Sequence, residues 1–158
     1  MPHHDDIRGQ LREDHASFLA ELEALRIEGD AHRSMTRLRA LRHAWAVHSL
    51  AEESVVYNPL ETLEGQSSPV VHSDERFIEH ELIEDLFEKL ERGRPGTLEW
   101  RARLKVTRDL VTRHIENEEL DVFARLARQL DAARLGAMAD AFVAERERFE
   151  RLEERKAA

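Results

Sequence analysis

Two ten-residue stretches of this chain of 158 residues repeat one arrangement of ionisable and aromatic side chains. Residues 48–57 read HSLAEESVVY, and residues 114–123 read HIENEELDVF. Each stretch begins with His, carries a Glu pair at its fifth and sixth positions, and ends on Val followed by an aromatic residue. A His and a Glu four residues apart lie side by side on a helix, with about 5–6 Å between their Cβ atoms. The repeat therefore predicts two helices of matching design.

Apolar residues recur at steps of three and four around both stretches, which is the spacing of one buried helix face. The two series are Leu38, Leu41, Trp45, His48, Glu52 and Val55, and Trp100, Leu104, Thr107, Val111, His114 and Glu118. His and Glu thus occupy positions where a helix normally places Leu, Ile or Val. Burying such side chains unpaired costs several kcal/mol, on the order of 2–7 per polar group. Something must compensate for that cost.

Gly and Pro cluster at Gly29, at residues 58–69 and at residues 92–96, and they divide the chain into helix-length segments. We expect helices near residues 5–28, 31–58, 73–92, 97–128 and 131–154. The predicted fold is all-α, an antiparallel up-down four-helix bundle over about residues 5–128. An additional C-terminal helix at about 131–154 packs outside the bundle. Residues 1–158 are expected to form a single domain.

The repeat extends beyond the two stretches. His15 follows Asp14 and His80 follows Glu79, and these histidines precede the repeated stretches by similar distances along the chain. The chain therefore reads as two helical hairpins related by a pseudo-twofold axis. Their seam positions would bring together His15, His48, Glu52, His80, His114 and Glu118, which suits two metal ions bridged by two carboxylates. The alternative is a structural polar layer without a metal.

The second glutamate of each stretch, Glu53 or Glu119, lies one position off the seam. Two interpretations stay open for this pair: a hydrogen bond to a ligand imidazole, or exposure to water.

The order His, His-x-x-x-Glu, His, His-x-x-x-Glu resembles the hemerythrin-like (HHE cation-binding) domains, over roughly residues 10–125. The resemblance implies that His15 and His48 bind one iron ion and that His80 and His114 bind the other. It also implies bridging by Glu52 and Glu118, with an oxo or hydroxo group completing the bridge. Manganese and zinc accept the same ligands and are not excluded.

One position departs from the oxygen-carrying hemerythrins, which have a fifth histidine four residues after the third. Here the segment reads HELIE, and Glu84 occupies that place. We predict Glu84 as a seventh metal ligand, with an ion pair to Lys89 or Arg76 as the alternative. A third carboxylate would favour the ferric state and lower the reduction potential.

The function predicted is that of a non-haem diiron protein that reacts with or binds O2, peroxide or NO. The alternatives are an iron- or oxygen-sensing or iron-storing module without turnover, and a reversible O2 carrier. Whether the protein is an enzyme, with oxidase- or peroxidase-like activity, stays open. No Glu-x-x-His occurs in the chain, which argues against a ferritin-type site.

Composition limits the partners. The net charge of −9 argues against nucleic-acid binding, and no apolar run approaches the roughly 20 residues that span a membrane. The chain has no cysteine, so thiolate metal sites and disulfides are excluded. We expect a cytoplasmic protein.

Overall fold

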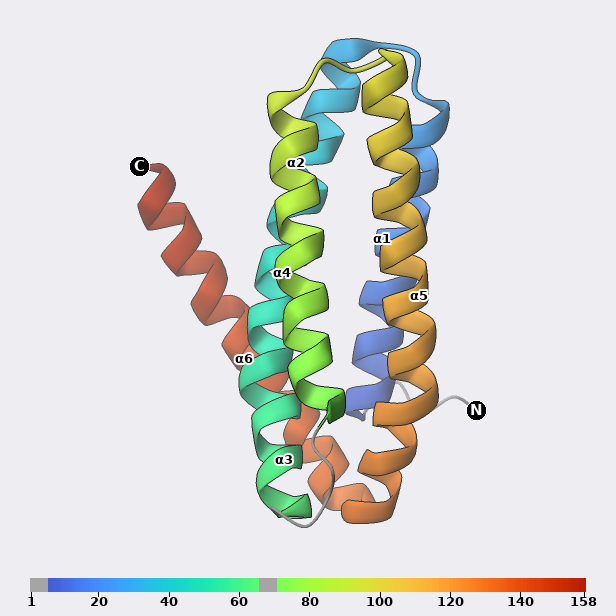
Figure 1. Ribbon diagram of the computed structural model, residues 1–158. Helices are drawn as coiled ribbons and strands as arrows, with labels where there is room; N and C mark the ends of the chain where they lie inside the picture. Colours follow the sequence, from blue (N-terminus) through green and yellow to red (C-terminus); the bar gives the residue numbers. More distant parts are fainter. Residues whose placement is uncertain (1–5, 66–70) are drawn as a thin grey trace.

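The structure, a computed structural model, describes residues 6–65 and 71–158. These residues form helices joined by short connections, with no strand among them, which confirms the all-helical prediction. The elements are α1 (Ile7–Ile27), α2 (Ala31–Glu52), the π-helical η1 (Glu53–Tyr57), α3 (Asn58–Glu64), α4 (Val71–Arg92), α5 (Leu98–Gln129) and α6 (Ala132–Ala157) (Figure 1). No helix of the described part is long and apolar enough to cross a membrane.

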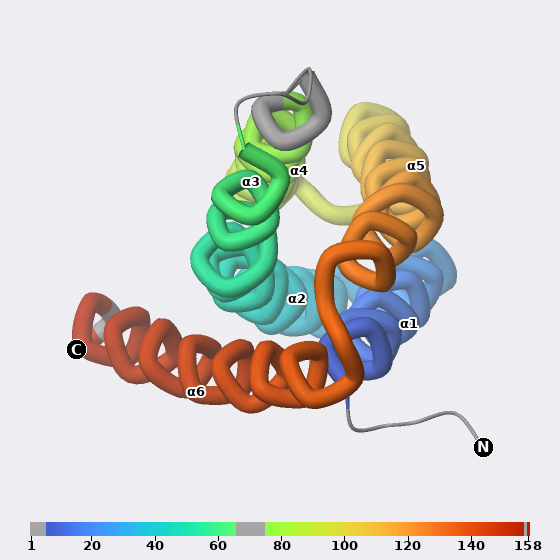
Figure 2. The backbone as a smooth tube through the Cα atoms, turned by 90° about the horizontal axis from the view of Figure 1, so that it is seen from below, coloured from blue at the N-terminus to red at the C-terminus, as the bar shows by residue number. Residues whose placement is uncertain are grey.

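The four long helices α1, α2, α4 and α5 lie side by side, each in contact with two of the others. Figure 2 shows α6 running across α1 and α2, on the side of the molecule away from α4 and α5. The prediction that the last helix packs outside the others is confirmed. The C-terminal half of α6 stands away from the other helices (Figure 1).

Side-chain caps fix where several helices begin. Asp6, Asp30, Thr97 and Asp131 each accept a hydrogen bond from a backbone N–H in the first turn of the helix that follows. Such caps satisfy N–H groups that have no partner within the helix, and each contributes about 1 kcal/mol. They fix the residue at which each of these helices begins.

The predicted helix end near residue 58 is wrong. The helix passes through η1 and continues as α3 to Glu64, where Gly65 ends it with a φ of 67°. Pro59 is tolerated because it lies at the start of α3, directly after the π-helical turn, where its missing N–H breaks no regular hydrogen bond. The last part of the predicted break, residues 66–69, lies outside the described residues.

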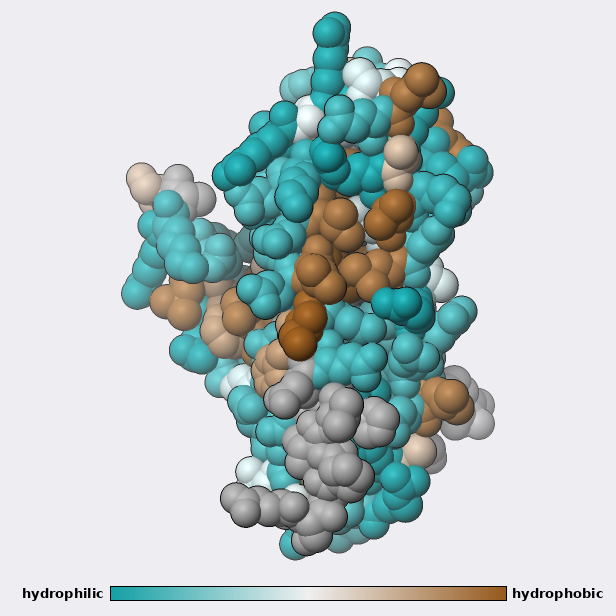
Figure 3. Space-filling view, viewed as in Figure 1, coloured by the Kyte–Doolittle hydropathy of each residue, from teal (hydrophilic) through white to brown (hydrophobic). Residues whose placement is uncertain are grey.

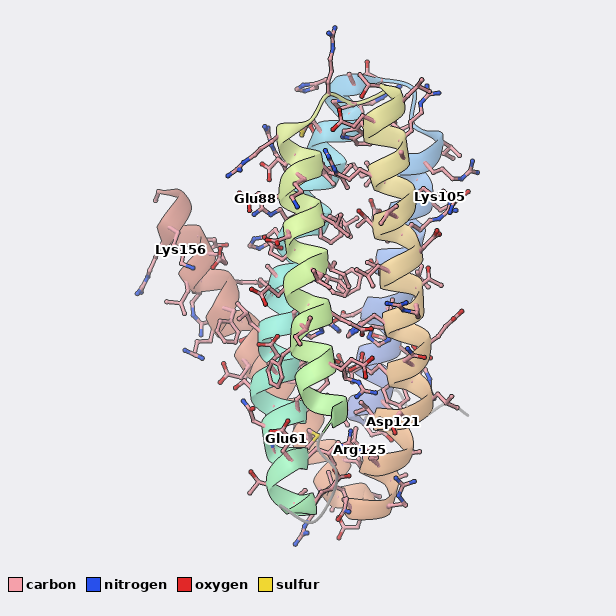
Figure 4. The ribbon with its side chains drawn as sticks, in the orientation of Figure 1. Glu61, Glu88, Lys105, Asp121, Arg125 and Lys156 are labelled. Carbon is pink, nitrogen blue, oxygen red and sulfur yellow. The ribbon has the colours of Figure 1, made fainter. Side chains whose placement is uncertain are left out.

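An ion pair between Glu64 and Arg125 links α3 to α5. The guanidinium of Arg125 donates to both carboxylate oxygens of Glu64, at 2.9 and 2.5 Å, and lies 3.4 Å from Asp121 on its own helix (Figure 4). The Glu64 carboxylate has a lowered pKa because Arg125 donates hydrogen bonds to it.

Buried apolar side chains form two separate clusters. One contains Tyr57, Phe123 and Phe142, and the other contains Trp45 and Phe87. Along α1, His15 falls between Leu11 of one cluster and Phe18 of the other, and along α5, Glu118 falls between Ile115 of one cluster and Val122 of the other. The fold therefore places a buried polar layer between two apolar layers.

Candidate metal centre

The six seam residues that the sequence predicts for a metal site come together in this polar layer. All of them are buried: His15, His48, Glu52, His80, His114 and Glu118. They come from α1, α2, α4 and α5, so each long helix contributes at least one side chain. The packing of these helices thus creates a site that no local segment could form alone.

Glu118 lies between one histidine of each hairpin. Its Oε2 atom is 3.2 Å from Nε2 of His15 and 3.8 Å from Nε2 of His114. The carboxylate itself is fully buried. Glu118 is therefore positioned to contact cations held by either histidine.

Glu52 occupies the matching place on the other side. Its Oε2 atom is 3.6 Å from Nε2 of His48 and 3.4 Å from Nε2 of His80. Two groups of residues have ligand atoms within 4.8 Å of one another: His15 with His48 and Glu52, and Glu52 with His80 and His114. Both groups share Glu52, which is the arrangement that a bridging carboxylate requires.

Several inward-facing atoms have no hydrogen-bond partner. They are Nε2 of His15 and His48, Oε1 of Glu52 and Oε2 of Glu118. Leaving such atoms buried and unpaired costs about 1–3 kcal/mol each. Imidazole nitrogens and carboxylate oxygens are ligands that iron, manganese and zinc accept, so cations at this position would satisfy these atoms. The residues fit the metal centre that the sequence predicts.

The outer nitrogen of every imidazole donates a hydrogen bond to a carboxylate on a neighbouring helix. The pairs are His15 with Glu119 (2.8 Å), His48 with Asp14 (2.8 Å), His80 with Glu53 (2.8 Å) and His114 with Glu79 (2.7 Å). A proton held on Nδ1 leaves the Nε2 lone pair free to point inward. Carboxylate partners of this kind orient ligand imidazoles and raise their basicity.

These pairs decide between the two interpretations left open for the second glutamates. Glu53 and Glu119 both accept hydrogen bonds from buried imidazoles, those of His80 and His15. The matching roles of Asp14 and Glu79 were missed, because each partners the histidine of the next helix rather than the histidine beside it in sequence. The signal was present: an acidic residue precedes the first histidine of each hairpin.

Replacing Glu79 with alanine tests the value of these outer contacts. We expect the Glu79→Ala chain to bind metal about 10–100-fold more weakly, because His114 loses the acceptor that fixes its ring. Competition with a chelator of known affinity measures the change. Glu81→Ala is the control, since Glu81 is exposed two residues away on the same helix. Equal affinities for the two variants would contradict the orienting role.

Tyr57 breaks the twofold symmetry of the site. Its hydroxyl lies 2.6 Å from Oε1 of Glu118 and 3.0 Å from Oε2 of Glu52, whereas its counterpart in the second stretch, Phe123, has no hydroxyl. The π-helical turn explains how Tyr57 reaches Glu52: hydrogen bonds spanning five residues bring residues five apart onto one face. The sequence singled out Tyr57 only as the aromatic residue that ends the first repeated stretch.

Burial and mutual charge perturb the acids and bases of this layer. Burial raises the pKa of Glu52 well above its usual value, and the neighbouring charge of Glu118 adds to the effect. Burial also raises the pKa of Tyr57, again with help from both carboxylates. Burial alone would lower the pKa of His15, but the Glu118 carboxylate, 3.2 Å from its Nε2 atom, raises it to about 9. For His48, burial prevails and lowers the pKa to about 4.

Aromatic rings enclose the imidazoles. The ring of Trp45 lies 5.7 Å from that of His80 and 5.8 Å from that of His114, and Phe142 of α6 lies 5.7 Å from His48. Both aromatic residues are almost fully buried. The rings shield the polar layer from water, which strengthens the electrostatic interactions within it.

Glu84, the seventh residue of the predicted set, lies in a different environment. Its Oε1 accepts a hydrogen bond from Arg42 Nε at 2.7 Å, and its Oε2 is buried without a partner. Burial raises the pKa of Glu84, and Arg42 opposes that shift. Glu84 belongs to neither of the two ligand groups found among the described residues. The predicted alternative was an ion pair of Glu84 with Lys89 or Arg76, and the observed ion pair is with Arg42 instead.

Buried imidazoles and carboxylates gathered by an all-helical bundle define a helical cation-binding domain. The Hemerythrin HHE cation binding domain family matches residues 6–126, which is most of the chain, and the chain belongs to this family. The match includes all six seam residues and the four carboxylates that hold the imidazoles. No curated protein and no solved structure matches the chain.

Proposed function

We propose that this protein is a non-haem diiron protein whose iron pair reacts with O2, peroxide or NO. Its scaffold would be the antiparallel up-down four-helix bundle of the hemerythrin type. One observation carries the proposal: four buried imidazoles turn Nε2 toward two buried carboxylates, and each imidazole is fixed from behind by a further carboxylate. His15 and His48 would hold one iron ion, and His80 and His114 the other.

Iron held in this way supplies one-electron redox chemistry and an affinity for small oxygen and nitrogen ligands. The two bridging glutamates, Glu52 and Glu118, would link the ions and neutralise part of their charge. Tyr57 holds a hydroxyl against both glutamates and can donate a proton to one of them. Manganese and zinc remain alternative metals, because the ligand atoms suit all three.

Small molecules are the proposed partners. O2, H2O2 and NO are the small ligands that an iron pair between these imidazoles would take. The proposal involves neither nucleic acid nor a membrane, in keeping with the net charge of −9. It places the reaction in the cytoplasm, where reducing conditions maintain ferrous iron.

The absorption spectrum of ferrous-loaded protein, taken before and after exposure to O2, tests this proposal. Irreversible conversion to the spectrum of a bridged ferric pair, followed by repeated turnover of added H2O2, is the expected result. Colour that bleaches under argon would instead identify a reversible O2 carrier. A chain that takes up no iron, manganese or zinc would overturn the metal site itself.

A sensing function is the second candidate, and one contact favours it. Arg146 of α6 lies 2.9 Å from Asp14, whose other oxygen accepts the hydrogen bond of His48. A change at His48 can therefore alter the docking of α6. Hydrogen exchange in α6 that rises on metal removal, in a protein without turnover, would favour sensing over redox chemistry.

The predicted role of Glu84 has its own test in the reduction potential. If Glu84 binds iron, the Glu84→Gln chain loses one negative charge at the site. Its reduction potential should therefore rise by roughly 60 mV or more, which is about a tenfold change in the equilibrium constant of a one-electron reduction. Potentiometric titration measures this. Glu91→Gln is the control, because Glu91 also pairs with Arg42 but lies two turns further along α4 from His80 than Glu84 does. An unchanged potential in Glu84→Gln would limit Glu84 to its ion pair with Arg42.

A further inference from the structure

The face formed by α4 and α5, opposite α6, exposes large apolar side chains. Ile78, Leu82 and Val106 are 54%, 49% and 55% exposed, and the partly buried Leu86 and Leu110 lie one turn further along the same helix faces. Figure 3 shows hydrophobic side chains gathered over these two helices. We call these five residues the α4/α5 patch. Contiguous apolar surface of this kind commonly marks an interaction site.

The internal repeat shows that the apolar character of this face is specific to the second hairpin. In the first hairpin, α6 packs across α1 and α2, with Phe142 buried against them. The residues equivalent to the three most exposed members of the patch are Glu13, Ser17 and Ala40. These three residues are small or polar and are themselves exposed, so large exposed apolar side chains at these positions are a feature of the second hairpin and not of the repeated design.

Beside the patch, α4 and α5 carry charges of opposite sign at the same height along the two helices. Near one end, exposed Glu81 lies on α4 at the level of Arg113 on α5, because Glu79 is 2.7 Å from His114 and 3.8 Å from Arg113. Near the other end, α4 carries Lys89 and α5 carries Glu99. These levels correspond because Arg103, which pairs with Glu99, donates to the carbonyl of Lys89.

We propose that a second copy of this chain covers the α4/α5 patch and that the two copies form a twofold symmetric dimer. A twofold axis parallel to the helices would place α4 of one copy against α5 of the other. Every residue would then face residues of the second copy at the same height along the helices. Leu82 would then meet the apolar residues of α5, and Glu81 would face Arg113 of the second copy. Lys89 would face Glu99 of the second copy. A twofold interface of this type requires a self-complementary surface, and the opposite charges on the two helices provide it.

The molecular mass of the iron-loaded full chain in solution tests the proposal. Light scattering and sedimentation at micromolar to submillimolar concentrations are expected to give twice the mass of one chain. Leu82→Glu should raise the dissociation constant at least about a hundredfold, because the twofold axis buries two carboxylates at once. Helix content and bound iron should be unchanged in this variant, which separates loss of the dimer from loss of the fold or of the metal site.

Leu152→Glu is the matched control, since Leu152 is an exposed leucine on the distant half of α6. It should leave the dimer intact. Dissociation by Leu152→Glu but not by Leu82→Glu would move the interface to α6 and overturn the proposal. A monomer at every concentration would also overturn it.

Charge reversal tests the orientation of the two copies. Glu81→Arg and Arg113→Glu alone should each weaken the dimer about tenfold, because each places like charges together twice per dimer. The double variant should restore most of the lost affinity. Additive weakening in the double variant would contradict the pairing of α4 with α5 of the second copy.

Discussion

A His48→Ala chain is expected to bind at most one iron ion, and the unaltered chain is expected to bind two. The substitution removes one imidazole from the group formed with His15 and Glu52. It also leaves Asp14 without the hydrogen bond from His48 and removes the ring against which Phe142 packs. Iron per chain after reconstitution and desalting measures the result.

The folded state of the His48→Ala chain should also be less stable than that of the unaltered chain. Truncating a buried side chain of this size costs about 2–5 kcal/mol, apart from the contribution of the metal. His43→Ala is the control: His43 lies five residues earlier on the same helix and is exposed. Full iron content in His48→Ala, or equal losses in both variants, would contradict the ligand assignment.

Removing the metal should lower the melting temperature of the unaltered chain by roughly 15–30 °C. Each ion bound at a free concentration a thousandfold above its dissociation constant stabilises the folded state by about 4 kcal/mol, and about 1 kcal/mol shifts the melting temperature by 2–4 °C in a domain of this size. Without metal, two buried carboxylates share a polar layer with His15 and His48, whose Nε2 atoms lack hydrogen-bond partners.

Thermal unfolding followed by circular dichroism, with and without a strong chelator, measures this shift. Adding ferrous iron or zinc back to the chelated protein provides the control for reversibility. A melting temperature that does not depend on metal would show that the polar layer is stable by itself. That outcome would favour the structural layer over the metal centre.

Much of the site could be predicted from the sequence because its residues follow helix periodicity. His48 and Glu52, four residues apart on an otherwise apolar stripe, indicate a buried polar pair without any knowledge of the neighbouring helices. The internal repeat then supplies the matching pair, His114 and Glu118. Local spacing and the internal repeat were together sufficient to predict that these six residues lie in one buried layer.

Contacts between helices could not be predicted in the same way. Arg42 binds Glu84 across two helices, and nothing in the spacing of either residue indicates the other. Likewise, Asp14 pairs with the histidine of the next helix because of how the helices are rotated against one another. Such pairings depend on side-chain direction after packing, which periodicity does not specify.

The π-helical turn was unpredictable for a different reason. Asn58 and Pro59 together normally end a helix, and the sequence was interpreted in that way. The wider turn, in which the Asn58 N–H donates to the Glu53 carbonyl, lets the helix continue through this pair. The same turn brings the hydroxyl of Tyr57 to Glu52, so the error at the helix end and the missed hydrogen bond have one cause.

Anomalous X-ray diffraction at the iron edge, from crystals of the iron-loaded protein, tests the central claim most directly. The account predicts two peaks of similar height, one beside Nε2 of His15 and His48 and the other beside Nε2 of His80 and His114. Both should lie within bonding distance of a shared glutamate carboxylate. A single peak, or peaks outside this buried layer, would contradict the diiron assignment.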